Sequence, residues 1–256
     1  MEYKKTFIRQ VIARIDFAAP LDKLEKEFPK GFDKLAQKKF PIKVPVQMVL
    51  PLPMIAGANI VADMTKKYPM WEYQDRKREN KLELLPTHMD VVFTKYTNYY
   101  EDLKNTFVEL SDALTKEITE ITIRRFGLRF INNIDVEDKS APTKWEKYLN
   151  KDLLSVFKMS QKSEDVLRAF SILTYRSDDV LLNFRYGMLN PDYPAPIKKK
   201  EFILDYDAFY EGLLEGKDIP AYLDLFHRKI YELFETCITK ETRKIMGPID
   251  GRKKKR

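Results

Sequence analysis

The sequence predicts an α+β fold in which antiparallel sheets carry long amphipathic helices. Several stretches alternate apolar and polar residues, the period of half-buried strands. Two longer stretches instead place apolar residues at three- and four-residue steps, the period of amphipathic helices. Glycine is sparse, at 8 of 256 residues, and the glycine-rich phosphate-binding motifs are absent. An α/β nucleotide-binding architecture is therefore disfavoured.

The first elements are a strand and a short helix. "VIARIDF" (11–17) has the alternation of a strand. It stops before Pro20, and "LDKLEKEF" (21–28) places leucine and phenylalanine on one side of a short helix. The stretch "FPIKVPVQMVLPLPM" (40–54) is rich in proline. Because proline cannot donate a ladder hydrogen bond, we expect an extended connection over the surface there.

The middle of the chain predicts a meander, a helix and a strand. The stretches 70–76, 80–85 and 89–96 are separated by polar turns and are typical of antiparallel strands. A helix of about five turns is expected over 99–118. Its apolar stripe is followed by the strand "ITIRRFGLRFINNIDV" (121–136). The stripe consists of Tyr100, Leu103, Phe107, Leu110, Leu114 and Ile118.

The C-terminal part repeats this plan of strands followed by a helix. We expect a helix over 144–157, a hairpin of 166–176 and 179–189 that turns at Ser177–Asp178, and a third strand over 200–209. A last helix should begin with Asp218 as N-cap and Pro220 in its first turn, and should end at Gly247.

These elements predict two similar halves that pack as one body. Residues 1–137 form an N-terminal sheet-plus-helix half, 138–248 a C-terminal one, and 249–256 a basic tail. No flexible linker is expected near 137–143, because that segment is short and each long helix needs a sheet to cover. A true structural repeat and a chance likeness both remain open, because few residues are identical between the halves.

Two stretches resemble signatures of an uncharacterised, sporadically distributed family of bacterial proteins of about 250 residues. They are "RRFGLRFINNI" (124–134) and "LDLFHRKIYELFETCITKETRKIMG" (223–247). In the first of them, Phe130 stands where a tyrosine is usual. The middle segment 71–107 is also similar to that family, although Tyr100 stands where a tryptophan is frequent. The resemblance implies one co-folded unit and brings no catalytic residues. The patchy distribution of that family implies that its members lie in mobile loci, such as those for phage defence, including CRISPR neighbourhoods.

The cysteine, histidine and nucleophile content of the sequence argues against most catalytic mechanisms and metal sites. The only cysteine is Cys237, which excludes an internal disulfide, and the only histidines are His88 and His227. His227 borders an apolar helix stripe and is interpreted as a packed structural residue. No nucleophile motif and no histidine pair occur, so we expect no metal and no cofactor. Without a leader or an apolar run of membrane length, the sequence predicts a cytoplasmic protein that does not bind membranes.

The strand 121–136 carries the most informative basic residues. Phe126, Leu128 and Phe130 share one face, which we expect to be core. Arg125 and Arg129 point the other way and flank Gly127, which leaves a notch in the sheet. Their Cα atoms should lie about 13 Å apart, a spacing that suits a phosphate backbone or an acidic partner surface.

An alternative reading pairs these arginines with carboxylates on neighbouring strands, such as Asp16 or Glu83, and we favour it slightly. Asp205 and Asp207 share a strand face and could bind a cation, but the end of a strand explains them better. The candidate partner- or phosphate-binding residues are Arg125, Arg129, Arg185, Lys198, Lys199 and Lys200.

Three function classes follow from these residues. The favoured one is a non-enzymatic adaptor or regulator that docks a protein partner, since tyrosine and arginine are enriched at interfaces. The alternative is a nucleic-acid-binding accessory protein that uses the basic strand face and the tail. An enzyme with an unrecognised site ranks last. The net charge of +7 decides little, because "GRKKKR" at the C-terminus supplies five positive charges. The oligomeric state stays open.

Overall fold

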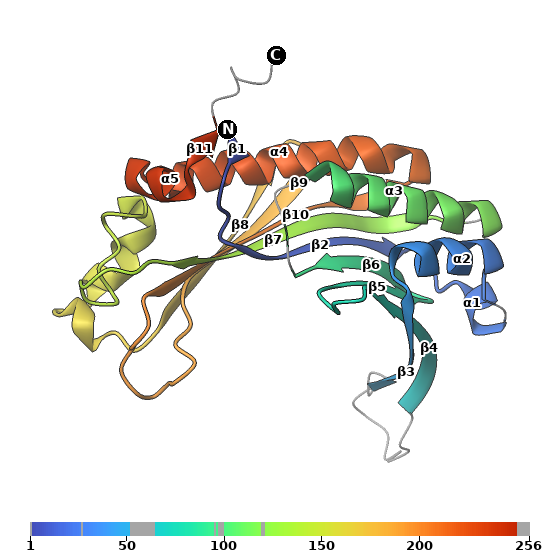
Figure 1. Ribbon diagram of the computed structural model, residues 1–256, viewed down its shortest axis with the longest axis horizontal. Helices are drawn as coiled ribbons and strands as arrows, with labels where there is room; N and C mark the ends of the chain where they lie inside the picture. The colour runs from blue at the N-terminus through green and yellow to red at the C-terminus, as the bar shows by residue number, and fades with distance from the viewer. Residues whose placement is uncertain are drawn as a thin grey trace, which may run out of the picture.

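The computed structural model describes residues 2–26, 28–51, 65–94, 96, 100–118 and 121–249. Its centre is a nine-stranded antiparallel sheet with the order β3-β4-β5-β6-β2-β7-β10-β9-β8 (Figure 1). A separate two-stranded pairing joins β1 (Glu2–Tyr3) to β11 (Pro248–Ile249). The predicted α+β fold with antiparallel sheets and long helices is confirmed.

The strands fall into two units with the same topology. In each unit the first strand lies at the sheet centre, the chain crosses to the sheet edge, a meander returns to the first strand, and a long helix follows. The first unit contains β2 (Ile8–Phe17), α1 (Asp22–Lys26), α2 (Lys30–Lys39), β3 (Ile42–Pro51), β4 (Thr65–Gln74), β5 (Asn80–Leu85), β6 (His88–Phe93) and α3 (Tyr100–Glu117).

The second unit begins with the strand that carries the predicted arginine face. It contains β7 (Ile123–Asp135), the 3-10 helices η1 (Lys151–Met159) and η2 (Ser163–Asp165), β8 (Ala169–Ser177), β9 (Val180–Met188), β10 (Glu201–Leu214), η3 (Gly216–Asp218) and α4 (Ile219–Cys237). A short helix α5 (Lys240–Met246) follows. The repeat thus starts with β7, whereas the predicted division falls after residue 137. Since β2 pairs with β7, one sheet runs through both units.

The helices α2, α3 and α4 cover one face of the sheet, and its other face is open over the central strands (Figure 1). The core lies between these layers because the strands turn their apolar residues toward the helices. Phe126, Leu128 and Phe130 of β7 are buried, as are Phe107 of α3 and Ile230 and Phe234 of α4. The face of β7 that was expected to be core is therefore confirmed as buried, and Phe126 contacts both helices through Phe107 and Phe226.

The helix ends follow local sequence signals. Asp218 occupies the N-cap position of α4 and a proline lies in its first turn, as predicted, but the Asp218 carboxylate makes no capping bond to α4 and accepts instead from the Glu215 N–H. Gly247 ends α5 with a left-handed φ of 68°, which glycine adopts without the Cβ clash of other residues. The last helix is, however, not continuous. It stops at Ile238, where the main chain pairs with Leu149, and Thr239 then caps α5 by accepting from the Thr242 N–H.

Two further predictions are corrected. The proline-rich stretch forms β3, an edge strand, instead of a loose connection; an edge strand tolerates proline because one side of its backbone makes no ladder bonds. The stretch 144–157 is not α-helical: it consists of turns and the 3-10 helix η1, whose N-cap Asn150 accepts from the Asp152 N–H at 3.1 Å. The helix α2 was not anticipated from the sequence.

The connection near 137–143 is tied to the body through Asp138. Its carboxylate accepts from the Tyr148 hydroxyl at 2.8 Å and from the Lys200 Nζ at 3.1 Å. Hydrogen bonds led by that from Ser140 lower the pKa of Asp138 well below its usual range. The carboxylate therefore stays ionised and holds this loop to the segment before β10.

Candidate functional site

The open face of the central strands carries four arginines and four aspartates that alternate across the sheet. We call these eight residues the charge ladder. Period-two alternation places them opposite the core, because residues that alternate with them along β2, β7 and β10, such as Ile15, Leu128 and Tyr206, are buried. The ladder consists of Arg14, Asp16, Asp90, Arg125, Arg129, Arg185, Asp205 and Asp207.

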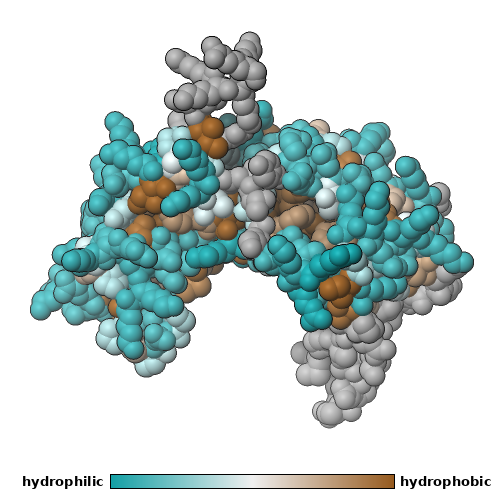
Figure 2. Space-filling model, viewed as in Figure 1, coloured by the Kyte–Doolittle hydropathy of each residue, from teal (hydrophilic) through white to brown (hydrophobic). Residues whose placement is uncertain are grey.

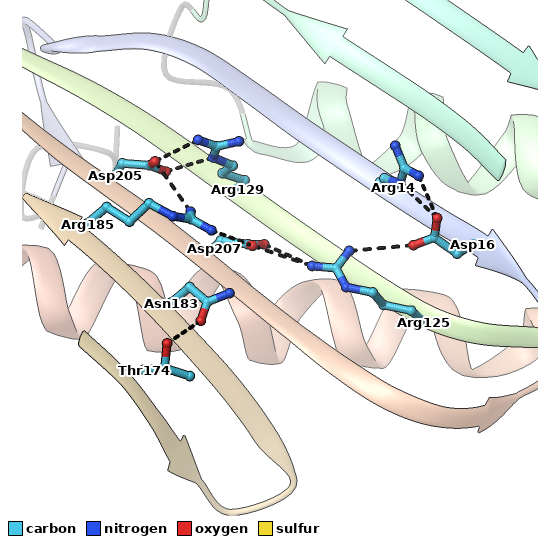
Figure 3. Close-up of polar contacts among 9 residues, drawn as sticks. All are labelled: Arg14, Asp16, Arg125, Arg129, Thr174, Asn183, Arg185, Asp205 and Asp207. Atoms are coloured by element: carbon cyan, nitrogen blue, oxygen red, sulfur yellow. Dashed lines mark hydrogen bonds and ion pairs between the residues drawn. The ribbon is translucent and has the colours of Figure 1, made fainter. Parts of the chain in front are cut away.

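The strongest pair joins Arg129 on β7 to Asp205 on β10. Its Nε and Nη2 donate to the two carboxylate oxygens at 2.7 Å each, a bidentate geometry (Figure 3). Arg185 on β9 approaches the same carboxylate at 3.4 Å. Asp205 is only 4% exposed, so two guanidinium groups compensate a buried charge.

Arg125 bridges the ladder between the two units. Its Nη1 lies 3.6 Å from Asp16 on β2 and its Nη2 lies 3.4 Å from Asp207 on β10 (Figure 3). The pairing of arginine with Asp16 was one of the two alternatives drawn from the sequence. Glu83 is not a partner of these arginines; it forms an ion pair with Lys81 on its own strand.

The notch expected at Gly127 is filled. Phe209 on β10 lies opposite Gly127, and a Cβ added at Gly127 would come within 3.1 Å of the Phe209 Cβ. The Arg125 guanidinium lies 4.3 Å from the centre of the Phe209 ring, a cation–π contact. Gly127 therefore makes room for this stack and leaves no open slot for a ligand.

At the end of the charge ladder that lies in the first unit, the buried carboxylate of Asp90 is incompletely compensated. Asp90 accepts from Arg14 at 3.3 Å through Oδ2, while its Oδ1 is buried and has no partner. Burial consequently raises the pKa of Asp90 to about 6 in spite of Arg14. Burial likewise lowers the pKa of the adjacent His88 to about 4, and the positive charge of Arg14 adds to this effect.

The remaining predicted basic residues do not join the ladder. Lys200 is buried, binds Asp138 and Ser140, and lies 5.5 Å from the ring centres of Trp145 and Tyr148, so its contacts are structural. Lys198 and Lys199 are exposed in the segment before β10. Of the predicted tail, Ile249 belongs to β11, and residues 250–256 lie outside the described residues. Of the candidates, the fold brings together Arg125, Arg129 and Arg185.

The other titratable candidates are packed in the core or at its margin. His227 stacks on Tyr100 with ring centres 3.8 Å apart and lies 5.9 Å from Phe130. Cys237 is buried, and burial raises the pKa of its thiol, which disfavours the reactive thiolate. Within the described ranges, no group of three or more histidine, cysteine, aspartate or glutamate side chains could hold a metal ion.

Asp205 and Asp207 were considered from the sequence only as cation ligands or as residues at a strand end. The structure makes them the partners of the arginines, and β10 continues past them to Leu214. The alternating spacing of Asp205 and Asp207 indicated that they share a strand face. The residues that lie opposite them on the neighbouring strands could not be read from the sequence. Arg14 and Asp90 were not predicted as part of any site.

Comparison with protein families and with curated proteins finds no match for this chain. The resemblance to the sporadically distributed family therefore stays a prediction. In the part of the chain that the structure describes, no helix is long and apolar enough to cross a membrane.

Proposed function

We propose that the protein is a non-enzymatic adaptor or regulatory protein that docks a protein partner on the open face of its sheet. The observation that carries this proposal is the internal pairing of the charge ladder. Each of its arginines lies against at least one aspartate of the same chain, and the eight residues divide equally between the two signs.

Internal pairing argues against the nucleic-acid alternative. Binding to a phosphate backbone gains its affinity from cations that replace counterions on phosphates. The ladder arginines are already neutralised by buried carboxylates, so a phosphate would have to compete with Asp205 and Asp207. Partner proteins, in contrast, read fixed patterns of both signs, because complementary charges set register and exclude wrong partners.

The shape of this face also suits a macromolecule. The ribbon arches so that the open face of the sheet lies on its concave side (Figure 1), and the left-hand wall of the hollow is largely hydrophilic (Figure 2). The ladder arginines remain partly exposed, with side-chain exposures of 24% to 37%. Their guanidinium groups can thus contact a docked surface without leaving their aspartates. The phage-defence or CRISPR-linked setting implied by the resemblance stays a prediction.

The decisive variant adds a positive charge to this face and removes no buried partner. Asn183 of β9 lies beside the ladder and bonds only to Thr174 among the drawn residues (Figure 3). An Asn183→Arg substitution should obstruct a docked protein, whereas it should strengthen binding to nucleic acid. Ser155→Arg, at an exposed position of η1, is the matched control because it adds the same charge outside the sheet that carries the ladder.

Two measurements separate the alternatives. In affinity capture from nuclease-treated native lysate, a specific protein should bind the wild type and Ser155→Arg but not Asn183→Arg. Anisotropy titrations of a labelled oligonucleotide at two salt concentrations, with residues 252–256 deleted, should show no salt-sensitive binding. Tight binding that Asn183→Arg improves would instead establish the nucleic-acid alternative, with a salt slope near 0.9 for each duplex phosphate contacted.

A further inference from the structure

The two edge strands of the nine-stranded sheet differ in how they are protected against pairing with another strand. One edge is β3, which contains Pro45 and ends at Pro51, two residues without a backbone N–H. The other edge is β8, whose one strand partner among the described residues is β9. Proteins protect an exposed edge with proline, bulges or charges, because unpaired N–H and C=O groups otherwise recruit another strand.

These protections are almost absent from β8. The strand contains no proline, its nine residues pair with β9 without a register shift, and its only charged residue is Arg176 near the end. Three of its apolar side chains are also exposed to solvent: Ile172 is 67% exposed, Leu173 51% and Phe170 39%. A regular, apolar edge of this length is built to pair with another strand.

The hairpin geometry decides which backbone groups are available. Ser177 and Val180 flank a two-residue turn and form its hydrogen-bonded pair. Since hydrogen-bonded and non-hydrogen-bonded residues alternate in an antiparallel pair, Phe170, Ile172, Thr174 and Arg176 direct their N–H and C=O groups away from β9. These residues also share the open face of the sheet, because their partners on β9 include Arg185 and Asn183.

We propose that β8 pairs with the β8 strand of a second copy of this chain, antiparallel and centred on Leu173. In this register Leu173 meets its own counterpart, and Ile172 lies opposite Thr174 of the other copy, which satisfies the outward backbone groups of both. Arg176 lies opposite Phe170 of the other copy, where a cation–π contact forms. The two Arg176 side chains are separated by six residues, about 20 Å, so like charges do not meet.

The pairing is isologous, since the same residues serve both copies through a two-fold axis perpendicular to the sheet. That axis keeps both helix layers on one side and both open faces on the other. Leu173 faces the helix side, where α4 leaves it half exposed, so the two leucines cover each other there. The result is one continuous sheet of twice nine strands, and the inference does not depend on what docks on the open face.

The mass in solution tests the proposal. The purified full chain, analysed by light scattering after size exclusion, should have twice the 30.3 kDa of one chain at tens of micromolar. Ile172→Lys should return it to 30.3 kDa, because an edge lysine opposes strand addition. The control is Leu213→Lys, which changes a residue of β10 that is 75% exposed, and it should remain dimeric.

Cysteine cross-linking tests the register. Leu173→Cys should form an intermolecular disulfide under mild oxidation, since residues directly opposite in a non-hydrogen-bonded pair lie about 4.5 Å apart at Cα. Thr174→Cys should cross-link at least tenfold more slowly, because its counterpart is displaced diagonally beyond disulfide reach. A wild-type mass of one chain at every concentration, equal disruption by Leu213→Lys, or equal cross-linking of both cysteines would overturn the proposal.

Discussion

Replacement of His227 by phenylalanine should remove a large part of the acid sensitivity of this fold. His227 stacks on Tyr100, and burial lowers its pKa from 6.5 to about 4, although the nearby charge of Asp224 opposes this. The unfolded chain therefore takes up a proton at this position before the folded chain does. The stability that His227 contributes is complete above pH 6.5 and is lost as the pH falls toward 4.

The magnitude follows from the two pKa values. Their gap of 2.5, from 6.5 down to about 4, corresponds to about 3.4 kcal/mol when the histidine is fully protonated in both states. At pH 5 the loss is about 2 kcal/mol, because the unfolded histidine is almost fully protonated and the folded one is largely neutral. Phenylalanine keeps an aromatic ring against Tyr100 but cannot titrate, so the variant should escape this loss.

Urea unfolding at pH 7 and at pH 5 measures the effect. The stability of His227→Phe relative to wild type should rise by about 2 kcal/mol between the two conditions. The same shift should appear in a His88→Gln background, which removes the other histidine of depressed pKa. A difference between His227→Phe and wild type that stays constant between pH 7 and pH 5 would refute the assignment of a buried, neutral His227.

Two further outcomes test the packing and the charge ladder. Phe130→Ala should lower the free energy of unfolding by about 3–5 kcal/mol in urea melting, because the ring is 4% exposed and packs edge-on against Tyr96. Phe130→Leu should lower it by less than about 1.5 kcal/mol. A loss below about 1 kcal/mol for the alanine variant would mean that this face is not core. Alanine substitution of Arg129, of Asp205 and of both should give a coupling energy of about 1–3 kcal/mol, reduced by the partial exposure of the arginine. Additive single effects would contradict the bidentate pair.

Part of this structure was predictable because it depends on residues close together in the chain. The alternation along β7 identified its core face, and the stripes along α3 and α4 identified the helix sides that cover it. The ends of the last helical region were also local, at Asp218 and Gly247. The break at Ile238 was not predictable from nearby residues, because the segment that pairs with its backbone, around Leu149, lies far away in the sequence.

The candidate site was predictable only as a face and not as a set of contacts. The sequence indicated that Arg125 and Arg129 point away from the core, and it left a phosphate, an acidic partner or an internal carboxylate as their ligand. The order of strands decides between them, because Arg129 meets Asp205 only after β10 pairs with β7, 76 residues later in the chain.

By itself, the sequence determined which residues of β7, α3 and α4 are buried, since side-chain period follows directly from backbone geometry. Tertiary structure alone decided which strands became neighbours and which became edges. That choice turned the arginines into a balanced ladder, made a proline-rich stretch into the edge strand β3, and placed β8 at the other edge, where one side of its backbone pairs with no other described strand. The physical reason is that ladder hydrogen bonds and ion pairs form between strands that are distant in sequence, so their partners are set by the order of the sheet.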